Sequence, residues 1–154
     1  MGVLTSSQIV SEFGSLSYTD NKNGSINLDP KWVAANIVTL HTVLIPNLWC
    51  HAKVARQFAC ALSKIHMQGL GNLIHSFDGA FVPRHQMWDL RKSLSRHSYG
   101  IAIDLNAATN PAGKVNHELE PIAAIFSEFN IAWAGLWAGS SVDSMHFEWF
   151  APMS

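Results

Sequence analysis

Two stretches of the chain have apolar residues at helical spacing, and they predict two amphipathic helices. Across residues 51–68 the apolar positions recur at intervals of three and four, and Gly69 follows directly. The same spacing returns across residues 118–129. Apolar residues at these intervals line one face of a helix, and a glycine just beyond the last periodic residue is typical of a helix end. Each helix is expected to pack one face on a common core.

The remaining apolar segments are short and rich in β-branched or aromatic residues, which favours strands. Residues 36–45 are β-branched, partly alternating and followed by Pro46, which cannot continue a strand interior. Further short segments of this kind are residues 73–77, 99–104, 131–133 and 145–149. We therefore expect an α+β fold, in which a small antiparallel sheet has helices packed on one face.

The first 28 residues differ in character from the rest. They are rich in Ser, Gly and Asn, with a strong turn signal at residues 20–24. We interpret residues 1–28 as an irregular N-terminal arm that can pack on the core through Ile9 and Phe13. Since no linker or repeat divides the remainder, residues 29–154 are expected to form one domain.

Composition excludes several classes of protein. With 48% hydrophobic and 14% charged residues, the 154-residue chain can bury a core, and a net charge near −1 without a basic cluster disfavours a nucleic-acid partner. No apolar run reaches the roughly 18 residues of a membrane span. The first residues lack the basic and apolar regions of a secretion signal. We expect a monomer made in the cytoplasm, with no membrane partner.

Residues 95–104 contain the first candidate chemistry. His97 and Asp104 offer an imidazole nitrogen and a carboxylate oxygen, both of which are zinc ligands, but zinc takes four ligands. If residues 99–104 form a strand, Gly100 and Ala102 share the face of Asp104 and leave a groove beside it. The competing interpretation is a half-buried strand with a solvent-exposed Asp104 and an incidental His97.

A second group of polar residues near the C-terminus favours the metal interpretation. His146 lies between apolar Met145 and Phe147, so its side chain is expected to leave a core-packed strand on the open face. Glu148 shares that face, and Asp143 precedes the strand by a few residues. Three protein ligands, an open position for water and a nearby carboxylate base are the requirements of a zinc hydrolase.

The two groups together resemble a known family. The motifs that carry the resemblance are Ser95-x-His97-x-x-Gly-x-Ala-x-Asp104 and Asp143-x-Met-His146-Phe-Glu. They are similar to those of the zinc D-alanyl-D-alanine carboxypeptidases and L-alanyl-D-glutamate endopeptidases, which share a fold with the Hedgehog signalling domain. Further agreement lies in Phe77-Asp-Gly-x-Phe-x-x-Arg84 and Trp133-x-Gly-x-Trp137. The resemblance spans about residues 36–150 and is greatest to the branch of phage endolysins.

The resemblance implies a role for each matching residue. His97, Asp104 and His146 would bind zinc, and Asp143 would be the base that activates the water. Arg84 would stabilise the carbonyl oxygen as it gains charge, or hold a substrate carboxylate; the simpler alternative for Arg84 is a surface salt bridge.

Two further residues and the substrate complete these expectations. Ser95 could orient the loop that carries His97, and Glu148 is either a rival base or a partner of Arg84 or of a ligand histidine. The implied partner is the peptidoglycan stem peptide, cut at its L-Ala–D-Glu bond to lyse the cell wall, with release through a phage holin. The alternatives are a D-Ala–D-Ala carboxypeptidase or dipeptidase, and a non-catalytic, zinc-stabilised Hedgehog-like binding domain.

Overall fold

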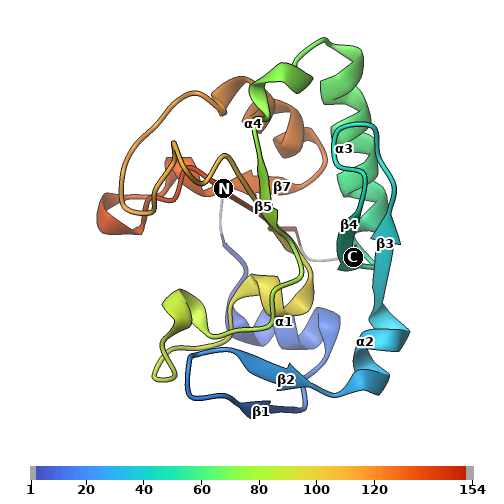
Figure 1. The fold of residues 1–154 in the computed structure, drawn as a ribbon, viewed down its shortest axis with the longest axis vertical. Coiled ribbons are helices and arrows are strands. Elements are labelled where there is room, and N and C mark those ends of the chain that lie inside the picture. Colours follow the sequence, from blue (N-terminus) through green and yellow to red (C-terminus); the bar gives the residue numbers. More distant parts are fainter. Residues whose placement is uncertain (1–2, 152–154) are drawn as a thin grey trace.

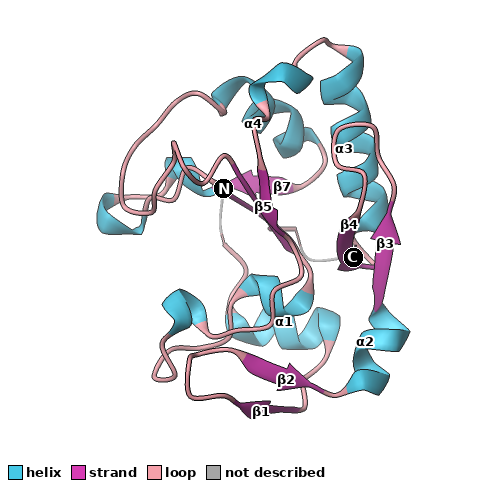
Figure 2. Ribbon diagram, viewed as in Figure 1, coloured by secondary structure: helices cyan, strands magenta, loops and turns pink. Residues whose placement is uncertain are grey.

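A four-stranded antiparallel sheet lies at the centre of the computed structural model, which describes residues 3–151 (Figures 1 and 2). Its strands, in spatial order, are β5 (Phe77–Gly79), β6 (Ala102–Leu105), β8 (His146–Trp149) and β7 (Ile131–Trp133). Every neighbouring pair is antiparallel. The first and last segments of this sheet are thus about 70 residues apart in sequence, and β6 and β8 form its middle.

Helices α3 (Ala55–Met67) and α4 (Glu120–Glu128) pack against each other and contribute to the core beside this sheet. The ring centroids of Phe126 in α4 and Phe147 in β8 are 4.8 Å apart. The core residues that the two helices and the strands share include Phe58, Leu62, Ile65, Ile103, Leu105, Ile122, Phe126 and Phe147. The expected α+β fold with a small antiparallel sheet is confirmed.

Alternation along β6 and β8 leaves their polar residues on the face away from this core. Asp104 is paired with His146 in the register, and Ala102 with Glu148. Between them, Ile103 and Phe147 are paired and fully buried in the core. Because successive side chains of a strand point to opposite faces, Asp104, His146 and Glu148 emerge together.

The strand predicted over residues 36–45 is shorter in the structure and is followed by an unpredicted one. Helix α2 (Pro30–Asn36) runs into β3 (Ile37–Leu40), which pairs with β4 (Leu48–His51). The chain turns between the two strands because Thr42 donates two hydrogen bonds to the carbonyl of Ile45, one from its hydroxyl and one from its backbone N–H. Local side-chain bonds of this kind compete with a sheet ladder.

The first long helix begins four residues later than predicted, since its expected start belongs to β4. The imidazole Nδ1 of His51 accepts a hydrogen bond from the N–H of Lys53, and the carbonyl of His51 accepts from Val54. This tight turn separates the strand from α3, which begins at Ala55. The helix predicted over residues 118–129 is present as Glu120–Glu128, close to the expected bounds.

The strand predicted over residues 73–77 is displaced towards the C-terminus. Residues Gly71–Leu73 form a 3₁₀ turn, and β5 instead includes the expected Asp78-Gly79 turn. The cause is Asn106, whose side-chain oxygen accepts hydrogen bonds from the N–H groups of His75 and Ser76. These backbone groups are therefore not free to form a sheet ladder.

The N-terminal arm has regular structure, which differs from the irregular arm that the sequence predicts. It contains helix α1 (Ser6–Phe13) and a hairpin of β1 (Tyr18–Asp20) and β2 (Ile26–Leu28). A capping box between Thr5 and Gln8 starts the helix. Ile9 and Phe13 are buried in the main core. Residues 1–2 lie outside the described part, and the division between residues 1–28 and 29–154 stays a prediction.

Within residues 3–151, no helix has both the length and the apolar character that crossing a bilayer requires.

Candidate metal centre

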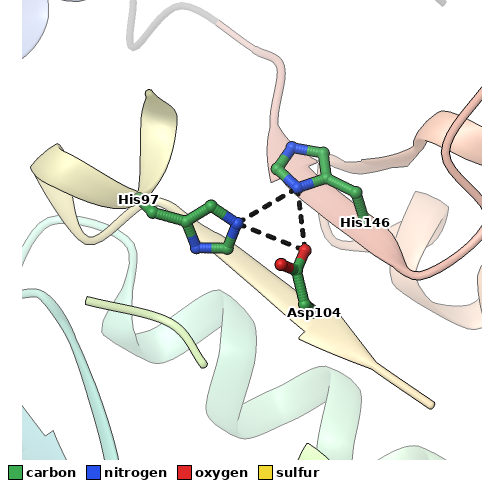
Figure 3. Close-up of side chains that lie close together, drawn as sticks. All are labelled: His97, Asp104 and His146. Carbon is green, nitrogen blue, oxygen red and sulfur yellow. Dashed lines mark hydrogen bonds and ion pairs between the residues drawn. The ribbon is translucent and has the colours of Figure 1, made fainter. Parts of the chain in front are cut away.

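Three side-chain atoms converge on one point of the polar face of the sheet (Figure 3). Nε2 of His97 lies 3.2 Å from Nδ1 of His146 and 3.2 Å from Oδ1 of Asp104. Nδ1 of His146 is 3.0 Å from the same carboxylate oxygen. A tetrahedral zinc ion with bonds of about 2.0–2.1 Å separates its ligand atoms by roughly 3.3 Å. The triangle is therefore close to the size that such an ion needs.

Hydrogen bonds on the far sides of the two imidazoles orient their lone pairs toward this point. Nδ1 of His97 is 2.9 Å from the carbonyl oxygen of Ala80, which can only accept, so this nitrogen carries the proton and Nε2 is bare. Nε2 of His146 lies 3.3 Å from Oε1 of Glu148 and donates to it. Metal-ligating histidines in proteins donate their second N–H in the same way. The residues present fit a zinc ion.

The electrostatics of the cluster favour a positive charge at its centre. Burial lowers the pKa of His146, but hydrogen bonds to Asp104 and Glu148 and the charges of these carboxylates raise it to about 10. Burial raises the pKa of Asp104, but its interactions with the imidazoles of His146 and His97 hold it well below its usual value. A metal that binds here takes the place of the proton on His146, so binding releases a proton.

The backbone around His97 is fixed by a short 3₁₀ helix, Arg96–Tyr99. The hydroxyl of Ser95 caps it by accepting a hydrogen bond from the N–H of His97, at 3.3 Å. Gly100 ends it in the left-handed region, with φ of 69°. A Cβ on Gly100 would lie 2.9 Å from the backbone nitrogen of His51. The expectation that Gly100 clears a groove beside Asp104 is thus wrong: this glycine permits close packing against β4.

Glu148 lies behind His146 and forms an ion pair with Arg96, a residue that the sequence did not single out. Its side chain is buried, with Oε2 3.4 Å from Nε of Arg96, and the nearby Nη2 of Arg96 donates to the carbonyl of Leu4 at 2.6 Å. Of the two partners considered for Glu148, the structure places it at the ligand histidine and not at Arg84. A charged residue between Ser95 and His97 was the available signal for Arg96.

Asp143 lines the same cleft, which has a volume of about 800 Å³ and includes the three clustered residues. Its Oδ1 is buried and has no hydrogen-bond partner within residues 3–151. Burial raises the pKa of Asp143, the positive charge of His146 opposes this, and the negative charge of Asp104 adds to it. The backbone holds the residue in place, because its N–H donates to Ala134 and its carbonyl accepts from His146. The backbone N–H of Met145 bonds to this carboxylate, and the unpartnered Oδ1 is free to accept a proton.

Arg84 contributes a cation to the cleft wall. Burial lowers the pKa of Arg84, and the charges of Asp104 and Asp143 raise it, as expected for groups that lie nearby. The guanidinium carbon lies 5.2 Å from the centre of the Trp88 ring, and Nη1 donates to the carbonyl of His85. The side chain is half-buried between these groups, unlike the exposed salt bridge considered as its alternative. The sequence reasoning did not assign a role to Trp88.

A comparison with known protein families matches the part of the chain that contains the candidate metal ligands. Residues 89–149 match a family model described as D-alanyl-D-alanine carboxypeptidase. The matched range includes His97, Asp104, Asp143, His146 and Glu148, and begins after Arg84. No curated protein and no solved structure matches the chain. The family match supports the zinc D-alanyl-D-alanine peptidase family in general terms.

Proposed function

We propose that this protein is a zinc-dependent peptidase that hydrolyses the L-Ala–D-Glu bond of the peptidoglycan stem peptide and so lyses the cell wall. One observation carries the proposal: three ligand atoms converge in a cleft that also contains Asp143 and Arg84. Structural zinc sites usually have four protein ligands, whereas catalytic sites have three and keep one position open. The family match supports a zinc peptidoglycan peptidase in general, and the bond is our own assignment.

The residues of the cleft divide the work of hydrolysis. When bound, zinc supplies Lewis-acid activation of a water molecule and polarises the carbonyl of the scissile bond. Asp143 accepts the proton of the attacking water and returns it to the leaving amine, a role worth roughly 10²–10⁴-fold in rate. Burial raises the pKa of Asp143, which makes its carboxylate a stronger base than an exposed one.

Arg84 acts on the negative charge of the substrate. Its guanidinium, positioned over Trp88, stabilises the carbonyl oxygen as charge develops or binds a carboxylate of the stem peptide. Glu148 is the weaker candidate for the base, because its Oε1 bonds to the imidazole nitrogen of His146 that is remote from the metal position. Its proposed role is to fix the ring of His146.

A D-Ala–D-Ala carboxypeptidase is the second candidate, favoured by the description of the matched family. We place the endopeptidase first because the two motifs resemble those of the endolysin branch, and the cleft of about 800 Å³ lies within the size range of binding pockets. A non-catalytic Hedgehog-like domain is the third reading. The buried Oδ1 of Asp143, which has no hydrogen-bond partner within residues 3–151, argues against it, since a structural site has no use for a base.

Digestion of purified peptidoglycan by the zinc-loaded protein tests the proposal, with the fragments identified by mass spectrometry. We expect stem-peptide fragments with a new N-terminal D-Glu, and none after removal of zinc by a chelator. Release of free D-alanine instead would establish the carboxypeptidase. A lack of any zinc-dependent product from peptidoglycan or D-Ala–D-Ala would overturn the proposal.

The endolysin-like resemblance suggests how the enzyme reaches its substrate. We infer that it accumulates in the cytoplasm and meets the wall after a holin opens the inner membrane. Expression in a bacterium with and without a co-expressed holin tests this inference. Lysis that needs both the holin and an intact Asp143 supports it, and equal lysis without the holin contradicts it.

A further inference from the structure

The backbone of Arg84 is held between the N-terminal arm and the loop that precedes His97. On one side, the N–H of Arg84 donates to the hydroxyl of Ser98, and its carbonyl accepts from the N–H of Ser95. On the other side, the hairpin β1–β2 lies against the segment after β5 (Figure 1). There the N–H of Ile26 donates to Pro83, and the N–H of His85 donates to Gly24. Arg84 itself is paired with Ser25 by an antiparallel bridge.

An ion pair between the buried imidazole of His85 and the half-exposed carboxylate of Asp20 connects the same two segments through their side chains. The residue His85 is only 4% exposed. Its Nε2 lies 2.6 Å from Oδ1 of Asp20 in β1, and its Nδ1 lies 2.6 Å from the carbonyl oxygen of Lys92. Both partners can only accept, so both ring nitrogens donate and the imidazole carries a positive charge. A charge-assisted bond of this length is among the stronger hydrogen bonds in proteins.

The turn of the hairpin also supports the aromatic ring on which Arg84 rests. Gly24 has φ of 87°, and a Cβ at this residue would lie 2.1 Å from the backbone oxygen of Trp88. The hairpin therefore touches the backbone of Trp88 directly. The Trp88 ring in turn lies 5.2 Å from the guanidinium of Arg84. Three contacts of the arm thus converge on one cation of the cleft wall.

We propose that Asp20 and His85 are positioning residues, which dock the N-terminal hairpin on residues 83–92 and thereby hold Arg84 over the cleft. The inference rests on the proposed function, since it assigns the arm to the anion-binding wall of that same site. Neither residue touches the three metal-binding candidates. The N-terminal arm is then part of the catalytic unit. The division predicted from the sequence at residue 28 places the two in separate parts of the chain.

A double-mutant cycle between Asp20→Ala and Arg84→Ala tests the proposal in the zinc-loaded full chain. Loss of a charged hydrogen bond is expected to lower kcat/KM about tenfold in Asp20→Ala. In the Arg84→Ala background, the same change should have no further effect, because Asp20 acts through Arg84. Zinc affinity should stay unchanged in both variants. An undiminished effect of Asp20→Ala in the Arg84→Ala background would overturn the proposal.

Thr19→Ala is the matched control. Thr19 is next to Asp20, and its hydroxyl accepts a hydrogen bond from Asn27 within the hairpin. It should leave kcat/KM unchanged. Solvent exchange of the Arg84 Nε–H, followed by NMR, gives a readout that needs no turnover. Exchange should quicken about tenfold in Asp20→Ala and stay unchanged in Thr19→Ala. If no substrate is cut, the proposed function fails, while unchanged exchange in Asp20→Ala refutes the positioning role itself.

Discussion

Glu148 Oε1 lies 3.3 Å from Nε2 of His146, on the other side of the imidazole from the nitrogen that faces Asp104 and His97. His146 and Glu148 are two residues apart in β8, so their side chains point to the same face and the strand itself sets their spacing. The carboxylate fixes which ring nitrogen keeps its proton. The other nitrogen, Nδ1, consequently faces the metal position without any adjustment of the side chain.

Removal of the charge on Glu148 should weaken zinc binding. In Glu148→Gln the side chain no longer favours a proton on Nε2 of His146, and loss of such a partner typically costs about 10–100-fold in metal affinity. Competition with a chromogenic chelator measures this. Glu128→Gln is the control, because Glu128 pairs with Lys64 on the surface. An affinity equal to that of the control would show that Glu148 has no part in orienting His146.

Removal of the carboxylate of Asp143 should separate metal binding from hydrolysis. Asp143→Asn keeps the shape of the side chain but cannot accept a proton, so kcat should fall roughly 10²–10⁴-fold. Zinc content and thermal stability should be close to those of the wild type. Atomic absorption and turnover of a stem-peptide substrate provide the two measurements. Activity that survives in Asp143→Asn but disappears in Glu148→Gln would transfer the role of the base to Glu148.

A methyl group at Gly24 should displace the hairpin from Trp88. Gly24→Ala adds a Cβ against a backbone oxygen, whereas Gly69→Ala, at φ of 73°, meets nothing within 4 Å. Both variants incur the strain of a left-handed residue, about 1–2 kcal/mol, and only Gly24→Ala adds the clash. Denaturant unfolding should therefore show a larger loss of stability in Gly24→Ala. If both variants lose the same stability, the hairpin does not pack as closely on Trp88 as the structure indicates.

The helices and the candidate ligands could be predicted from the sequence because their signals are local or chemically narrow. The apolar spacing of α3 and α4 is the property that buries them, and the strand Ile131–Trp133 has the predicted bounds. The roles of His97, Asp104 and His146 came from residue type and a resemblance. The structure brings their ligand atoms together, which spacing alone could not establish.

Bonds to residues distant in sequence override local preference at two of the misplaced elements, residues 73–77 and the N-terminal arm. The side-chain oxygen of Asn106 accepts hydrogen bonds from the N–H groups of residues 75 and 76, which are then not available for a sheet ladder. The arm has a polar, turn-rich sequence, yet its hairpin is ordered by Asp20 and Gly24 through contacts more than 60 residues away in sequence. Arg96 was likewise not singled out, because its partners Leu4 and Glu148 lie at opposite ends of the chain.

The buried His51 should make the stability of the protein depend on pH. Burial, and to a lesser extent the charge of Lys53, lower the pKa of His51 to about 4, so the folded state keeps this ring neutral. Its Nδ1 accepts from Lys53, and Nε2 is buried with no hydrogen-bond partner in residues 3–151. A proton added to the ring therefore has no acceptor to stabilise it.

The sign follows from the two pKa values. The unfolded chain binds a proton at His51 below a pH of about 6.5, and the folded protein does so only near 4, so stability is complete above 6.5 and falls as the pH drops. Between pH 7.5 and 5 the wild type should lose about 2 kcal/mol more than His51→Gln, which cannot titrate. Urea unfolding of the zinc-saturated proteins measures this, with His66→Gln, an exposed helix residue, as the control. Parallel pH profiles of the wild type and His51→Gln would mean that His51 is not held neutral by its surroundings.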